Sequence, residues 1–339
     1  MSVRLSETAE DISKIAFGFM ASKALFAGLH IDVFSSLSEK PKTSAEIARE
    51  TGVPMNRITT LMTALTSIGL VDRNDETYSN SAGADAFLAR GAKYEFGDYL
   101  RYQIDRQMYP FLDQLNDVLD GSLDPDAVDS YQNWMADPKE ASLYCNAQHA
   151  GSLGPGRTIA RLVDLTEAKH LLDVGGGTGA MSIRLLEAYP ELSSTIIDFP
   201  NVAEIGWQFI SDAGMVDRIR YIPSNALTTE WPSEQDVVLM SYLISGVPGT
   251  EVPGLLKNAF DNLVPGGKLL IHDFMVEDDR SGPPMAALWQ LQHMAFTPDA
   301  RSVTPEWLKE QIKQTGFTDI GEDEVVPSLT RLIHAVKQD

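Results

Sequence analysis

Residues 170–198 read HLLDVGGGTGAMSIRLLEAYPELSSTIID, and this stretch decides the fold. An apolar run at 171–174 is followed by the glycines of 175–179 and then by a segment whose apolar residues have mostly helical spacing. A second apolar run at 195–197 follows, and the stretch ends on Asp198. The pattern predicts a strand, a glycine turn, a helix and a second strand. Glycines let the backbone turn sharply and approach a ligand closely, and an acid closing the second strand can accept hydrogen bonds from a ribose diol. We therefore expect a nucleoside-like cofactor here, rather than an ordinary packing turn between two strands.

The residues around the glycine turn favour S-adenosylmethionine over a dinucleotide. A dinucleotide fingerprint has the pattern G-x-G-x-x-G, whereas this turn reads G-G-G-T-G and Asp173 stands two positions before it. A carboxylate there opposes a pyrophosphate but suits the cationic amino-acid part of S-adenosylmethionine. Together, Asp173, Gly175, Gly177 and Gly179 resemble the D-x-G-x-G-x-G motif of the class I methyltransferases.

The composition indicates a soluble small-molecule enzyme. The chain has 339 residues, of which 43% are hydrophobic, so one large or two medium domains with a sizeable core are expected. Its formal net charge of −21 disfavours binding to nucleic acid or to anionic membranes. The single cysteine, Cys145, excludes an internal disulfide framework, fits a buried thiol better than a nucleophile, and suits the reducing cytosol. We expect a cytoplasmic protein, because the N-terminus lacks the apolar centre of a signal peptide and no run approaches the roughly 20 apolar residues of a membrane helix.

The N-terminal region predicts a helical module with a winged-helix pattern. Residues 11–37 are expected to form a helix that is apolar on more than one face, which would pack against a partner subunit or within its own domain. Thr43 and Glu46 give a capping signal for a short helix, Pro54 begins a second helix, and a two-stranded wing follows. Because the second helix carries only Arg57 as a cation and the wing is acidic, we interpret the module as a dimerisation scaffold rather than a DNA reader.

A helical middle region leads into an alternation of helices and strands. Residues 94–119 predict a long helix broken near Pro110, residues 121–138 predict a loop, and Pro138 begins a helix that the glycines of 151–156 interrupt. From residue 170 to the end of the chain, strands and helices alternate. This order predicts the α/β fold class for the C-terminal part and a mainly helical N-terminal part.

Three further segments extend the resemblance over almost the whole chain. They are Ile197-Asp198-Phe199-Pro200-Asn201-Val202, Leu263-Val264-Pro265-Gly266-Gly267-Lys268, and Glu306-Trp307 followed by Thr315-Gly316-Phe317. Their order and spacing resemble the O-methyltransferase family that carries an N-terminal winged-helix dimerisation domain. The resemblance implies a Rossmann-like sheet of seven strands, an acceptor pocket between the domains and a homodimer. It divides the chain into a dimerisation domain over residues 1–120, a helical linker contributing to the acceptor pocket over 121–165 and an S-adenosylmethionine-binding domain over 166–339.

The resemblance also assigns the cofactor site. The implied cofactor-binding residues are Asp173, Gly175, Gly177, Asp198, Phe199, Asn225, Ala226 and Ser241. Asp198 would hold the ribose hydroxyls. Members of the family often have Gly-Asp near the adenine, and this chain has Ser224-Asn225 instead, where Asn225 can still hydrogen-bond an exocyclic amine.

The informative departure from the family lies at Ser245. The family usually has a Leu-His-Asp-Trp run whose His deprotonates the acceptor hydroxyl, but here Ser245 stands in the place of that His and Gly246 in the place of the Asp. Serine has no accessible pKa for general-base work near neutral pH, and Asp273, about where the family has its supporting acid, has no His to orient. A thioether acceptor needs no base, because its sulfur attacks through a neutral lone pair and becomes a sulfonium. Catalysis then requires alignment, exclusion of water and an aromatic wall for the cation.

These features resemble the bacterial S-methyltransferases that act on methylthiohydroxybutyrate in dimethylsulfoniopropionate synthesis. The residues expected to bind the acceptor, from their family position, are Tyr131, Trp134, Tyr144, Gln148, His149, His293 and Met294. A hydroxy-acid acceptor also needs donors for its carboxylate, for which Arg106 or Arg301 are further candidates.

Three other interpretations remain open from the sequence. An O- or N-methyltransferase acting on a phenol or polyketide could recruit His149 or His293 as its base. A metal-dependent C-methyltransferase could use His272, Asp273 and His293 as ligands, although neighbouring strand residues point to opposite faces. A winged-helix DNA-binding regulator is disfavoured by the scarcity of basic residues in the module.

Overall fold

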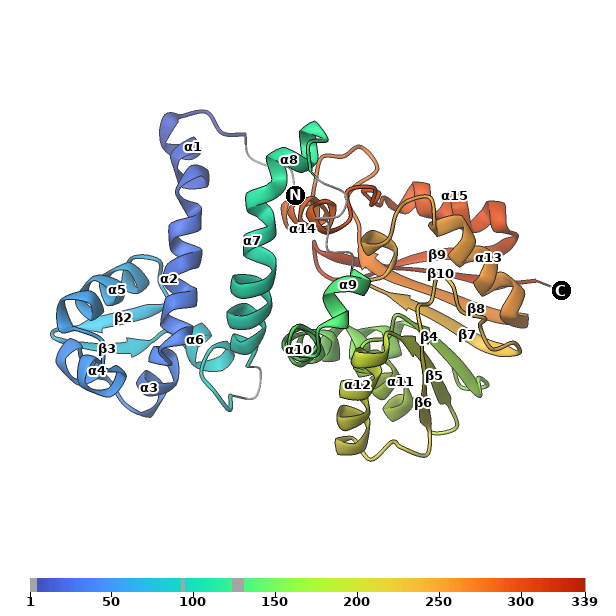
Figure 1. The fold of residues 1–339 in the computed structure, drawn as a ribbon, viewed down its shortest axis with the longest axis horizontal. Helices are drawn as coiled ribbons and strands as arrows, with labels where there is room; N and C mark the ends of the chain where they lie inside the picture. Colours follow the sequence, from blue (N-terminus) through green and yellow to red (C-terminus); the bar gives the residue numbers. More distant parts are fainter. Residues whose placement is uncertain (1–4, 93–94, 124–130, 339) are drawn as a thin grey trace. The chain divides into compact units, whose positions relative to one another are not determined.

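The computed structural model describes residues 5–92, 95–123 and 131–338, which divide into two compact units (Figure 1). The first unit ends at Tyr109 and the second begins at Pro110. Each unit has its own hydrophobic core, with one cluster of buried side chains in the first unit and two in the second.

The first unit is mainly helical and contains a small sheet. Its elements are α1 (Ala9–Ala16), α2 (Gly18–His30), α3 (Val33–Glu39), β1 (Lys42–Thr43), α4 (Ser44–Thr51), α5 (Met55–Ser67), β2 (Val71–Asn74), β3 (Thr77–Asn80), α6 (Ala82–Phe87) and the π-helix η1 (Tyr99–Met108). The single helix expected over residues 11–37 is wrong, because the run breaks at Phe17 and again at Asp32, which has a φ of 56°. The capping signal is confirmed by reciprocal bonds between Thr43 and Glu46. The wing has a third strand, in the order β1-β3-β2.

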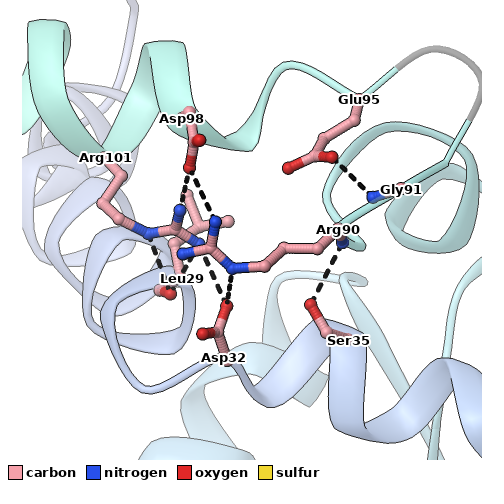
Figure 2. Close-up of polar contacts among 8 residues, drawn as sticks. All are labelled: Leu29, Asp32, Ser35, Arg90, Gly91, Glu95, Asp98 and Arg101. Atoms are coloured by element: carbon pink, nitrogen blue, oxygen red, sulfur yellow. Dashed lines mark hydrogen bonds and ion pairs between the residues drawn. The ribbon is translucent and has the colours of Figure 1, made fainter. Parts of the chain in front are cut away.

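Two arginines join the end of α2 to η1. Figure 2 shows the guanidinium groups of Arg90 and Arg101 together, with Asp98 on one side and Asp32 on the other. Arg101 is buried, and its Nε and Nη2 donate to the carbonyl oxygen of Leu29 at 3.0 and 2.8 Å. Arg90 Nε donates to Asp32 at 2.7 Å. A cation at the C-terminal end of α2 complements the helix dipole, so this cluster fixes the unit without facing a ligand.

The second unit is built on a seven-stranded sheet in the order β6-β5-β4-β7-β8-β10-β9 (Figure 1). The strands are β4 (His170–Val174), β5 (Ser193–Asp198), β6 (Ile219–Pro223), β7 (Gln235–Ser241), β8 (Leu263–Phe274), β9 (Phe317–Val326) and β10 (Thr330–Lys337). Strands β4 to β8 pair in parallel, and β10 runs antiparallel between β8 and β9. This sheet confirms the predicted α/β class.

Helices cover both faces of the sheet and extend beyond it. They are α7 (Tyr109–Phe111), η2 (Leu112–Gln114), α8 (Leu115–Asp120), α9 (Tyr131–Ala136), α10 (Pro138–Leu162), α11 (Ala180–Ala188), α12 (Pro200–Asp212), η4 (Ile244–Gly246), α13 (Val252–Asn262), α14 (Pro284–Phe296) and α15 (Pro305–Thr315). One core cluster packs α13 and α15 on the sheet, and the other packs α10, α11 and α12 on the opposite face.

Of three expectations for the middle region, two are wrong. The expected break near Pro110 is a change of helix type within a continuous helical run, from the π-helix η1, which ends at Met108, through α7 to the 3₁₀-helix η2, which begins at Leu112. The loop expected over residues 121–138 contains α9. The glycines do not interrupt α10, which packs closely on α11: a Cβ at Gly156 would lie 3.0 Å from Cβ of Arg184. Close packing on a neighbouring helix compensates for the low helix propensity of glycine.

The N-terminal helices carry much apolar surface. Among the described residues, the stretch Ala9–His30, which contains α1 and α2, could by length and composition cross a membrane, with a mean hydropathy of 1.3, so the expectation that no run approaches this length is wrong. Only 17% of an 18-residue window within this stretch is buried, and the exposed side chains of the stretch include Ile12, Ile15 and Phe19. An exposed apolar face of this kind also fits the interface of a dimer.

Candidate functional site

A cavity of about 690 Å³ lies at the carboxyl ends of the parallel strands in the second unit. This is the edge at which open α/β sheets bind ligands, and the volume is within the usual range for a small-molecule site. The cavity is lined by the glycine turn after β4, by residues 197–199 at the end of β5, by 224–227 after β6, and by 241–243 and 246–248 at and after the end of β7. Residues of α8, α9, α10 and α14 complete its wall.

The glycine turn has a backbone conformation that is strained for residues other than glycine. Gly175, Gly177 and Gly179 have φ values of 67°, 57° and 76°, a region open to glycine and strained for most other residues. The turn is held by hydrogen bonds at Gly177, whose N–H donates to Asp198 Oδ2 at 2.7 Å and whose carbonyl accepts from the Tyr221 hydroxyl at 2.8 Å. The backbone therefore passes close to the cavity in one defined shape.

Two carboxyl groups stand on the cavity wall beside this turn. Asp173 is fully buried and accepts a hydrogen bond from Ser182 Oγ at 2.6 Å through Oδ2, while its Oδ1 has no partner in the part of the chain that the structure describes. Asp198 also accepts from the backbone N–H of Phe199 at 2.7 Å. Burial raises the pKa of Asp173 to about 7 and that of Asp198 to about 6. An unpartnered buried carboxylate oxygen and a second acid at a strand end fit a ligand that brings a cation and hydroxyl donors.

The structure brings together every residue expected to bind the cofactor. The residues of that set, which all line the same cavity, are Asp173, Gly175, Gly177, Asp198, Phe199, Asn225, Ala226 and Ser241. Asn225 Oδ1 accepts from the backbone N–H of Leu227 at 2.9 Å, which fixes the segment after β6. Sequence reasoning did not include Thr178 and Leu243, which also line the cavity and could have been found as neighbours of the motif residues.

Ser245 is locked in place by Asp273. Ser245 is 1% exposed, its Oγ donates to Asp273 Oδ1 at 2.5 Å, and its backbone N–H donates to Asp273 Oδ2 at 2.9 Å. Asp273 also accepts from the backbone N–H of Phe274, and burial raises the pKa of this carboxyl to about 6. Neither Ser245 nor Asp273 is among the described residues that line the cavity. This pair therefore holds η4 against β8 and presents no base to an acceptor.

His272 and His293 are buried and neutral. The ring of His272 is hydrogen-bonded on both sides, through Nδ1 to Ser241 Oγ and through Nε2 to Thr330 Oγ1, each at 2.9 Å, and burial lowers its pKa to about 3. Burial lowers the pKa of His293 to about 4, and its Nδ1 has no partner among the described residues. In the described ranges, no three His, Cys, Asp or Glu side chains are grouped as metal ligands would be.

One face of α10 also lines the cavity. Tyr144, Gln148 and Ser152 are spaced four residues apart, which puts them on one face of the helix, and all three line the cavity. Phe296 and Met135 lie along the same wall. Ser152 and Phe296 were missed by sequence reasoning; Ser152 could have been found by extending the helical spacing from Gln148.

The remaining acceptor candidates lie elsewhere. Trp134 is behind the wall, with its ring 5.1 Å from that of Tyr144 and 5.3 Å from that of Phe296. Neither His149 nor His293 lines the cavity, nor does the half-buried Met294. Tyr131 begins α9, but its side chain lies outside the described residues. Arg106 is exposed in the first unit, and the guanidinium of Arg301 stacks on the ring of Trp307 at 4.6 Å. No arginine or lysine is among the described residues that line the cavity.

Comparison with known proteins identifies two matching domains. Residues 127–318 match the O-methyltransferase domain family, and residues 13–90 match the O-methyltransferase dimerisation domain. The first match covers the cavity lining except Val118, Gly121 and Leu123, and the second covers the winged-helix module of the first unit.

Individual relatives span nearly the full chain. The tetracenomycin polyketide synthesis 8-O-methyl transferase TcmO of Streptomyces glaucescens is 27% identical over 312 residues, which are 91% of each chain. The L-tyrosine C(3)-methyltransferase of Streptomyces lavendulae is 25% identical over 317 residues, which are 91% of this chain and 86% of the relative. Among solved structures, human N-acetylserotonin methyltransferase in complex with SAM has the same fold, with a TM-score of 0.87, 21% identity and full coverage of both chains.

Proposed function

This chain belongs to the O-methyltransferase family and is an S-adenosylmethionine-dependent methyltransferase of a small molecule, and we propose that it methylates the sulfur of a thioether hydroxy acid. The proposed acceptor is 4-methylthio-2-hydroxybutyrate, and the proposed role is dimethylsulfoniopropionate synthesis. In this reaction the new S–C bond forms as the donor's S–C bond breaks. The positive charge passes from one sulfur to the other, and no proton is released.

The observation that carries this proposal is the state of Ser245. A hydroxyl acceptor must lose a proton to a base, and the family's usual position for that base holds a serine whose hydroxyl is already donated to Asp273. The pair is buried and away from the described cavity lining. A thioether needs only alignment with the methyl donor and exclusion of water, which a largely apolar wall provides.

The cavity residues fit the donor. S-adenosylmethionine supplies an electrophilic methyl group on a sulfonium centre. We propose that Asp198 accepts hydrogen bonds from its ribose hydroxyls and that the unpartnered Oδ1 of Asp173 faces its cationic amino-acid part. The turn at Gly175 and Gly177 lets the backbone approach closely, and we propose that Asn225, which also lines the cavity, binds the adenine.

Neutral polar groups fit the other end of a hydroxy acid. The side chains of Gln148 and Ser152 line the cavity and have no hydrogen-bond partner among the described residues. On α14, both amide atoms of Gln292 and Nδ1 of His293 are buried without a partner among the described residues, but neither side chain lines the cavity. We propose Gln148 and Ser152 as donors for the carboxylate and hydroxyl, with Tyr144 in the aromatic wall that favours the sulfonium product.

Two structural roles complete the proposal. α1 has no buried side chain, and a helix of its length is unstable alone in water, so we propose that the first unit forms a homodimer through α1 and α2. We also retain the three-part division, with a dimerisation domain over residues 1–120, a pocket-forming linker over 121–165 and a methyltransferase domain over 166–339. A cytoplasmic location accompanies this proposal.

A second candidate is O-methylation with His293 as base, favoured by its unpartnered Nδ1 and neutral ring. Proton balance separates the two, because 4-methylthio-2-hydroxybutyrate carries both a thioether and a hydroxyl. In weak buffer with a pH indicator, S-methylation releases no proton per turnover, whereas O-methylation releases one. One proton per methyl transferred would favour the second candidate and contradict the first.

A further inference from the structure

His149 makes its contacts away from the acceptor wall. It follows Gln148 on α10, but successive helical residues point in directions about 100° apart, and the ring of His149 is directed to the glycine turn. Its Nδ1 is 2.8 Å from Thr178 Oγ1, and its ring stacks on Phe209 of α12 with centroids 3.9 Å apart and planes 18° apart. The ring is therefore fixed by one hydrogen bond and one stacking contact.

The hydrogen bond from His149 ends on the side chain of Thr178, which belongs to the glycine turn. Thr178 stands between Gly177 and Gly179, both of which have positive φ, is 4% exposed, and lines the cavity. A glycine-rich turn has high conformational freedom, so its shape depends on external contacts. Three elements supply them: Asp198 of β5 and Tyr221 of β6 bond Gly177, and α10 bonds Thr178 through His149.

We propose that His149 is a positioning residue for the methyl donor, which holds the glycine turn through Thr178, and that it does not contact the acceptor. The inference rests on binding of S-adenosylmethionine at this turn, as proposed above, and is independent of the acceptor's identity. Burial lowers the pKa of His149 to about 4, so the ring is neutral near neutral pH and does not repel a cationic ligand.

The same helix thus serves both ends of the reaction. The face with Tyr144, Gln148 and Ser152 lines the acceptor wall, while His149 ties α10 to the turn that carries the donor. The close approach of α10 to α11 at Gly156 fixes α10 against the helix that follows the turn. These two contacts tie α10 to the turn and to α11, which helps to align the donor and the acceptor.

Binding of S-adenosylhomocysteine to the ligand-free protein, measured by calorimetry without an acceptor, tests this inference. H149F keeps the stacking ring and removes the hydrogen bond, and we expect about 3- to 10-fold weaker binding and faster amide hydrogen exchange in residues 175–179. T178V should give the same loss, and the double variant should be no weaker than either single variant. H149Q, which keeps a hydrogen-bonding group, should recover part of the affinity. The KM for the acceptor should change by less than about 2-fold.

His170 provides a matched control, because its Nδ1 lies 3.2 Å from Ser193 Oγ at the opposite end of β4. H170F should leave binding and exchange of residues 175–179 unchanged. Normal ligand binding by H149F, with or without a raised acceptor KM, would overturn the inference, as would additive losses in the double variant. If H149F does not fold, T178V removes the same hydrogen bond and carries the comparison, with H149Q as the variant that keeps a hydrogen-bonding group. Absence of binding by the wild-type protein would instead refute the proposed donor site.

Discussion

At the scale of single residues, the bond between Ser245 and Asp273 separates a structural role from a catalytic one. We expect S245A to keep kcat within about 3-fold of wild type, because the hydroxyl is sealed from the cavity. The variant should lose about 1–3 kcal/mol of unfolding free energy, since Asp273 is left buried with one partner fewer. Steady-state kinetics and urea unfolding measure the two effects. A loss of kcat of about 100-fold or more, the range of a general base, would show that Ser245 takes part in the chemistry.

The acids of the cavity predict a pH dependence of donor binding. The pKa values of Asp173 and Asp198 are raised to about 7 and about 6, so both carboxyls are partly protonated in the free protein at mildly acidic pH. A cationic ligand favours their ionised forms. The affinity for S-adenosylmethionine should therefore increase as the pH rises through about 6 to 7, with proton release on binding, and level off above that range.

Calorimetry in buffers of different ionisation enthalpy measures both the affinity and the protons released. D173N serves as the control, because it removes the carboxyl with the higher pKa and should flatten the upper part of the profile. An affinity that is constant from about pH 5.5 to about pH 8.5 would contradict this assignment of the two acids.

At the scale of elements, Gly206 of α12 leaves space for Tyr221 of β6, which bonds the glycine turn. A Cβ at Gly206 would lie 1.9 Å from the Tyr221 hydroxyl, which donates to the carbonyl of Gly177. G206A should push Tyr221 off the turn and weaken donor binding at least as much as Y221F, which removes only one hydrogen bond. G254A is a suitable control, because Gly254 of α13 has open space around its Cβ position. Equal donor binding by G206A and wild type, measured by calorimetry, would refute this contact.

The elements also show what the sequence could and could not predict. The sheet and the glycine turn were predictable because strand and helix periodicities alternate clearly around 170–198. The continuity of α10 could not be predicted, because it depends on packing against α11. The residues of α11 lie later in the sequence, so the α10 segment read by itself does not reveal this contact. The same limit applies to His149: its neighbour Gln148 faces the cavity, and only the packing of α10 shows that His149 faces Thr178.

At the scale of the whole molecule, the exposed face of α1 predicts a dimer. Ile12 and Ile15 are 61% and 73% exposed in the single chain, and burying them in a partner would be favourable. The double variant I12E/I15E should therefore be monomeric by light scattering, whereas V216E, at an exposed position of the second unit, should keep the wild-type mass. A monomeric wild-type protein, or a dimeric I12E/I15E variant, would contradict the interface.

The donor half of the whole site was predictable from sequence, and the acceptor half was predictable only in part. Donor residues follow strand ends, which the topology of a parallel sheet brings to one edge, and all of the expected set line the cavity. Acceptor residues come from helices whose faces depend on tertiary packing. Of that set, Tyr144 and Gln148 line the cavity, while Trp134 lies behind it.

The most direct test of the central claim is methyl transfer from labelled S-adenosylmethionine to a panel of acceptors. The panel contains 4-methylthio-2-hydroxybutyrate, phenols and keto acids, each with the purified wild-type protein. The account predicts a labelled sulfonium product from the thioether hydroxy acid and little or no label in the phenols. Transfer to phenols without transfer to the thioether would contradict it.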